Sequence, residues 1–92
     1  MGRDSLRDKV REVVLTGKLP PRPPDRVWGG RGGGAPCSVC NVPIQREEVE
    51  FELEFLRAGQ ITTNHLHVDC FTAWECERDD FNLARDDLER SA

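Results

Sequence analysis

The fold is decided by residues 37–74, which read CSVCNVPIQREEVEFELEFLRAGQITTNHLHVDCFTAW. Two pairs of potential metal ligands bracket this stretch, namely Cys37 with Cys40 and His67 with Cys70. Two residues separate the members of each pair, and 26 residues lie between Cys40 and His67. Zinc binds sulfur and nitrogen ligands tetrahedrally, and closely spaced pairs are typical of structural zinc sites. The sequence therefore predicts one structural Zn²⁺ ion per chain, held by Cys37, Cys40, His67 and Cys70.

The residues between the two pairs predict a β-hairpin that brings the pairs together. Apolar residues at 49, 51, 53 and 55 alternate with Glu48, Glu50, Glu52 and Glu54, as in a half-buried strand. Residues 57–60 form a predicted turn, and the β-prone residues 61–66 form the returning strand. The apolar spacing becomes helical from Asp69, a suitable capping residue, to about residue 78. A knuckle, a hairpin and a helix in this order predict a small α+β module of the treble-clef type.

Several choices at this site stay open in the sequence. His65 shares a strand face with His67 and is the alternative histidine ligand, although the spacing to Cys70 favours His67. Cys76 is expected to be a free or half-buried thiol. Zinc is preferred to iron as the metal. The C-x2-C pair could instead be a redox pair, but such pairs normally open a helix in a larger α/β domain, and a set of buried free cysteines is the other alternative.

Two further segments precede the predicted zinc module, which spans residues 37–81. Residues 1–17 are predicted to hold an amphipathic helix over 5–16, with Gly17 as its stop signal. Its apolar face should pack on the rest of the domain or on another chain, because a helix this short is marginal alone. Residues 18–36 are rich in proline and glycine and predict a linker, within which Trp28 is expected to be buried. Residues 82–92 are expected to continue the last helix or to fray.

Charge is divided unevenly along the chain, whose net charge is −4. Residues 1–36 carry eight basic and four acidic residues, or +4, whereas residues 37–92 carry five basic and thirteen acidic residues, or −8. The acidic module disfavours nucleic acid as the main partner, because phosphate contacts need clustered Lys and Arg. The sequence shows neither a long apolar run nor a signal-peptide pattern. We therefore expect a cytoplasmic protein without a membrane partner, in which reduced cysteines favour metal over disulfides.

Two resemblances rest on these residues. The run 35–44, the glutamate-rich strand and the ending at residues 67–74 resemble the zinc finger of poly(ADP-ribose) polymerases over about residues 35–75. This resemblance implies zinc binding by the same four residues and a role at broken DNA ends, but glutamates stand where a DNA-binding strand would carry Lys or Arg. The chain is also similar over most of its length, including residues 23–30, to a group of small bacterial proteins of uncharacterised function.

The predicted site favours a non-catalytic function. Four protein ligands leave no open coordination position for water, and no Ser-His-Asp arrangement or other catalytic set stands out. We therefore expect a protein-interaction or regulatory adaptor with a protein partner that the sequence does not identify. One alternative is nucleic-acid binding through a basic arm that contains Arg22, Arg26 and Arg31. Another is a thiol redox or zinc-responsive sensor that uses labile ligands or Cys76.

Overall fold

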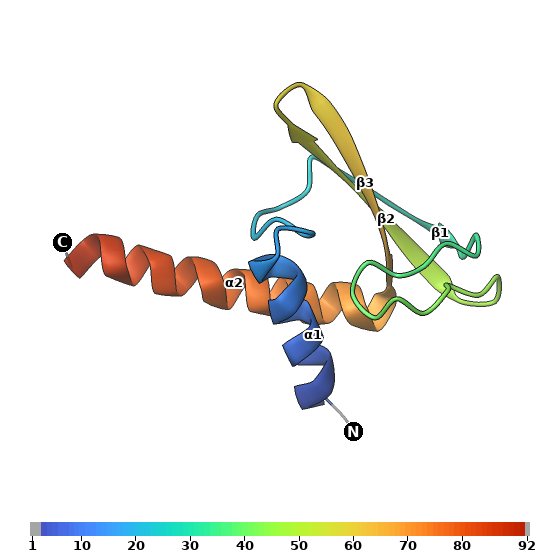
Figure 1. The fold of residues 1–92 in the computed structure, drawn as a ribbon, viewed down its shortest axis with the longest axis horizontal. Helices are drawn as coiled ribbons and strands as arrows, with labels where there is room; N and C mark the ends of the chain where they lie inside the picture. The colour runs from blue at the N-terminus through green and yellow to red at the C-terminus, as the bar shows by residue number, and fades with distance from the viewer. Residues whose placement is uncertain (1–2, 92) are drawn as a thin grey trace.

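The computed structural model describes the backbone of residues 3–91 and the side chains of residues 5–79. It contains two helices and three strands, which are α1 (Arg3–Leu15), β1 (Arg26–Arg31), β2 (Val49–Arg57), β3 (Gln60–His67) and α2 (Val68–Ser91). The strands form one antiparallel sheet in the order β1-β2-β3. Figure 1 shows the β2–β3 turn projecting away from both helices. The small α+β class predicted from the sequence is confirmed.

The β2–β3 hairpin follows directly from the alternating sequence. Its register pairs Phe51 with Leu66 and continues to a tight turn at Ala58 and Gly59. Both turn residues have positive φ, of 49° and 80°, which matches the right-handed twist of the flanking strands. The hairpin ends at His67, immediately before α2, so it returns the chain to the region of Cys37 and Cys40.

The core lies between one face of the sheet and the two helices. Leu53, Phe55 and Leu66 are fully buried under α2, where the Phe55 ring meets the Trp74 ring edge-on at a centroid distance of 6.0 Å. α1 packs across α2 and contributes the fully buried Val10 to the same core. Its basic residues pair with one carboxylate of α2, with Arg11 Nε lying 3.0 Å from Glu77 Oε2 and Arg7 on the other oxygen. The apolar face of α1 is therefore used within the chain.

Part of the segment predicted to be a linker is instead a strand of the sheet. Within residues 18–36, β1 pairs with β2 over its whole length, and Gly34 donates a further hydrogen bond to Ile44 O. The linker prediction is therefore wrong for residues 26–31. Glycine has a low strand propensity, but the hydrogen bonds to β2 hold this segment as a strand. The expected burial of Trp28 is also wrong, since its side chain is 45% exposed.

The last helix is longer than its apolar spacing predicts. α2 runs without interruption to Ser91, so it crosses the predicted module boundary at residue 81. Of the two alternatives for residues 82–92, the helical one holds for residues 82–91. Figure 1 shows this C-terminal half of α2 extending past α1.

Gly32, which follows β1, packs closely against the backbone of residues 44 and 45, and its substitution tests this contact. A Cβ at this position would lie 2.0 Å from Gln45 O and 2.7 Å from Ile44 O, both of which are backbone atoms. We expect Gly32→Ala to lower the free energy of unfolding by about 2 kcal/mol, because a backbone clash of this kind forces the two segments apart. The measurement is urea unfolding of the purified chain. Gly33→Ala is the matched control, since a Cβ there meets no atom within 4 Å. Equal stability of the two variants would contradict this account.

Candidate metal centre

The structure brings Cys37, Cys40, His67 and Cys70 together as predicted. Their ligand atoms all lie within 4.8 Å of one another, in a group whose cysteines at 37 and 70 are buried. The first two residues come from the loop before β2, His67 ends β3, and Cys70 lies in the first turn of α2. Three separate segments thus converge on one point, and this Cys3His group could hold a metal ion.

The knuckle that carries the first two cysteines is a tight backbone turn. Asn41 N–H donates to Cys37 O at 2.9 Å, and Cys37 N–H donates to Val42 O at 3.0 Å. Asn41 takes a positive φ of 66°, a conformation that asparagine adopts more readily than most residues. Val39 N–H also points to Cys37 Sγ at 3.4 Å, which favours the thiolate form of that sulfur.

Ser38 and Asn64 fix the knuckle to the sheet, and neither was expected from the sequence. Ser38 N–H donates to His65 O at 2.8 Å, and Ser38 Oγ donates to Asn64 Oδ1 at 2.9 Å in a buried setting. The second bond pairs the buried Ser38 hydroxyl with Asn64 Oδ1, while Asn64 Nδ2 has no partner among the described residues. Together the two bonds align the knuckle with the end of β3. The position of Cys37 and Cys40 relative to His67 therefore depends on Ser38 and Asn64.

The distances at His67 identify Nδ1 as the nitrogen that faces the sulfurs. Cys40 Sγ lies 3.4 Å and Cys70 Sγ 4.0 Å from His67 Nδ1. Tetrahedral bonds of about 2.3 Å to sulfur and about 2.0 Å to nitrogen place the two ligand atoms roughly 3.5 Å apart. Both observed separations lie close to that value, so the group fits a tetrahedral ion.

The opposite nitrogen of His67 faces a carboxylate. His67 Nε2 lies 3.7 Å from Glu48 Oε1, and the same oxygen accepts a hydrogen bond of 2.9 Å from Gln45 N–H. A metal-binding histidine usually turns its second ring nitrogen to such a carboxylate, which fixes the ring orientation. Glu48 thus belongs to the centre, although the alternating pattern assigned it only to the outer row of glutamates.

His65 lies outside the Cys3His group. Its Nδ1 is 3.1 Å from Glu50 Oε2 and its Nε2 is 4.0 Å from Glu52 Oε1, on the outer face of the sheet. Of the two histidines that the sequence left open, His67 is the one that the structure groups with the cysteines. Cys76 is exposed on α2 and is likewise outside the group.

Electrostatics at the two buried cysteines favour a bound cation. A hydrogen bond from Cys70 lowers the pKa of Cys37 to about 4, although burial opposes the shift. The pKa of Cys70 is raised, first by that same hydrogen bond and then by burial and the neighbouring sulfurs. The two thiols therefore compete for a proton in a confined space. A divalent cation removes this competition, because it compensates all the thiolates at once.

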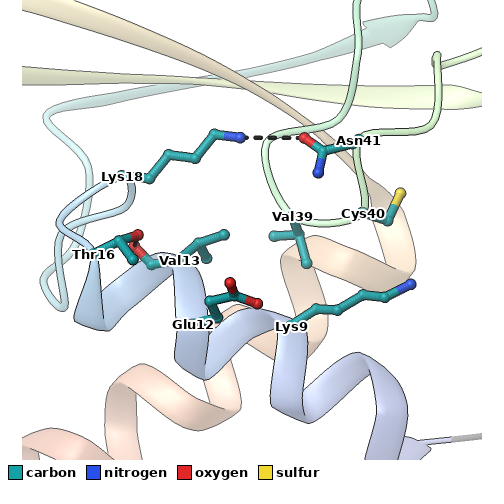
Figure 2. Close-up of a pocket in the computed structure, with 8 residues that line it drawn as sticks. All are labelled: Lys9, Glu12, Val13, Thr16, Lys18, Val39, Cys40 and Asn41. Atoms are coloured by element: carbon teal, nitrogen blue, oxygen red, sulfur yellow. Dashed lines mark hydrogen bonds between the residues drawn. The ribbon is translucent and has the colours of Figure 1, made fainter.

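The N-terminal helix lies against the knuckle. A pocket of about 290 Å³ lies between them. Figure 2 shows Val13 of α1 opposite Val39 of the knuckle. Lys18 Nζ lies 3.3 Å from Asn41 Oδ1, and Lys9 lines the same pocket beside Cys40. A divalent cation held by three thiolates and a neutral imidazole would leave a net negative charge, which these two ammonium groups would partly offset.

The three arginines proposed for a basic arm lie on the segment that leads into β1 and on β1 itself. Arg22 Nη2 donates to Leu56 O at 2.9 Å, and its guanidinium lies 5.3 Å from the Phe55 ring centroid. Arg26 and Arg31 lie at opposite ends of β1. Within the described part of the chain, no helix has the length and apolar character needed to cross a membrane.

Comparison with protein-family models, with curated proteins and with solved structures finds no match for this chain.

Substitution of the two histidines distinguishes the predicted ligand from its neighbour. We expect His67→Ala to weaken zinc binding by more than about 100-fold, which exceeds the usual effect of losing an outer partner of a ligand. His65→Ala should leave zinc affinity nearly unchanged, because His65 contacts glutamates and none of the four ligand atoms. Competition with a chromophoric zinc chelator measures both affinities. Comparable losses in the two variants would contradict the assignment of His67.

Proposed function

We propose that the protein is a structural zinc-binding module of treble-clef type that acts as a non-catalytic protein-interaction or regulatory adaptor. One observation carries the metal-binding part, namely that four soft ligand atoms from three segments lie within 4.8 Å of one another. Three thiolates and an imidazole are the donor set that proteins use for zinc, and the absence of carboxylate from the set disfavours magnesium, calcium and manganese.

A structural role follows from the number and origin of the ligands. Four protein atoms complete a tetrahedral shell, so no coordination position remains for a water molecule that could attack a substrate. The ion would join the knuckle, the end of β3 and the start of α2. Zinc binding contributes on the order of 10 kcal/mol in small zinc domains, which is comparable to the whole stability of an ordinary domain.

The order of elements supports the treble-clef assignment and the resemblance to the polymerase-type finger. A knuckle with two cysteines precedes a hairpin, and the last two ligands lie at the junction of the hairpin and a helix. The resemblance does not extend to DNA contacts, because Glu50 and Glu52 lie on the outer face of β2 and contact His65. The resemblance therefore supports the metal site and does not support a DNA-binding role.

The adaptor role is supported by apolar side chains on the sheet face that α2 does not cover. Leu56 and Ile61 are paired across β2 and β3, and they are 55% and 64% exposed. Trp28 is exposed on the same face. The apolar face of α1 is already packed against α2, so the sheet is the better candidate for a contact with another protein.

The metal-binding part of the proposal is tested by elemental analysis of the chain purified without added zinc. The wild type and Cys76→Ser should each retain about one zinc ion per chain, as expected for a complete Cys3His site. Cys40→Ser should lose the ion and its cooperative unfolding transition, and a strong chelator should do the same to the wild type. A folded wild type without metal would overturn the proposal.

The adaptor role is tested by affinity capture with the zinc-loaded full chain. We expect at least one protein to be retained by the wild type and reduced at least about fivefold by the double variant Leu56→Ser with Ile61→Ser, because hydrophobic contacts at the centre of an interface dominate binding. Leu15→Ser is the matched control, since Leu15 is an exposed apolar residue on α1. Capture that is insensitive to the sheet variant, or the lack of any captured protein, would count against the adaptor role.

A further inference from the structure

The free edge of β1 is a second feature that the metal centre does not explain. β1 is an outer strand of the sheet, and all six of its residues are exposed. Gly32 N–H donates to Glu48 O in continuation of the β1–β2 register. Because hydrogen bonding alternates along an antiparallel strand, Trp28 and Gly30 direct their backbone groups to β2, and Val27, Gly29 and Arg31 direct theirs outward. These outward groups form a template for one more strand.

We propose that two copies of this chain associate through their β1 strands. The strands pair antiparallel about a two-fold axis at Trp28, which joins the two sheets into one of six strands. The pairing goes beyond the proposed function and does not depend on it, because β1 carries none of the four ligands. It is independent of the paired Leu56 and Ile61 as well, since they lie on β2 and β3.

The register follows from the side chains of β1. With the axis at Trp28, this residue faces the partner's Trp28 at a position where the strands share no hydrogen bonds and side chains approach closely. Aromatic pairs at such positions are among the contacts that stabilise antiparallel strands. The exposed Trp28 side chains would then cover each other.

The charges of β1 are complementary in the same register. Arg26 lies opposite the partner's Gly30, where a Cβ would meet no atom within 4 Å. Within the partner, Gly30 is paired with Glu50 of β2. The Arg26 side chain of one copy can therefore extend over the partner's Gly30 towards the carboxylate of the partner's Glu50. Arg31 lies opposite the partner's Asp25, whose carboxylate already bonds Leu56 N–H and Arg22 of its own chain. The charge complementarity therefore rests on Arg26, and no arginine faces another arginine.

The register with the axis shifted by one residue to Gly29 is less favourable. Moving the axis to Gly29 places Arg26 opposite the partner's Gly32, over which the backbone of residues 44 and 45 lies. An unrelated extended peptide could also pair with the outward backbone groups, but it would need its own aromatic and basic residues at the spacing that β1 already has. A second copy supplies both by symmetry.

The experiment measures self-association of the zinc-loaded full chain by sedimentation equilibrium from about 10 μM to about 1 mM, a range that covers weak dimers. We expect a monomer–dimer equilibrium. Amide exchange should slow at Val27, Gly29 and Arg31 as the concentration rises, whereas the amide of Trp28 should be protected throughout. A monomer at every concentration overturns the proposal.

Substitutions at Gly30 test the register. Gly30→Lys places a cation opposite Arg26 of the partner subunit and should raise the dimer Kd at least about tenfold, whereas Gly30→Glu should lower it by about threefold. Gly33→Lys is the matched control, because Gly33 also has open space at its Cβ but lies beyond β1. Unchanged dissociation constants for both Gly30 variants would show a dimer formed through another surface and would overturn the proposal.

Discussion

The convergence of three chain segments on one point is the constraint on which the rest of this structure depends. The knuckle, the last residue of β3 and the first turn of α2 must place three sulfurs and one imidazole nitrogen within reach of a single ion. This requirement sets the length of the hairpin, because β3 must end where β2 began. It also sets the direction of α2, since Cys70 follows His67 by less than one helical turn.

Glu48 links this centre to the edge of the sheet. Its carboxylate faces His67 Nε2, its backbone N–H donates to Gln45 O, and its carbonyl accepts from Gly32 N–H. The imidazole, the turn before β2 and the end of β1 are therefore held by one residue. The hydrogen bond from Gly32 requires glycine at that position, because only a residue without a side chain can lie so close to the backbone of residues 44 and 45.

The parts predicted correctly from the sequence are those with strong local patterns. The alternation of apolar residues with glutamates predicted the β2–β3 hairpin, because it matches the two-residue period of a strand. The spacing within the Cys-Cys and His-Cys pairs predicted which four side chains would lie together. β1 was missed because it carries no alternating pattern. Its glycines lower its strand propensity, and it is held by hydrogen bonds to β2. Ser38, Asn64 and Glu48 were missed because their roles depend on contacts between segments, and single polar residues carry no periodic signal.

The packing of α1 decides which surfaces remain for other molecules. Val10 is fully buried and Glu77 pairs with both Arg7 and Arg11, so the helix is fixed by apolar and ionic contacts together. Arg7 and Arg11 also hold the pKa of Glu77 below its usual value, against the opposing effect of its burial. The inner face of the sheet is occupied by α2. The outer face and the β1 edge are therefore the parts of the sheet that stay exposed. A strand that paired at this edge would gain backbone hydrogen bonds, and Trp28 would set its register.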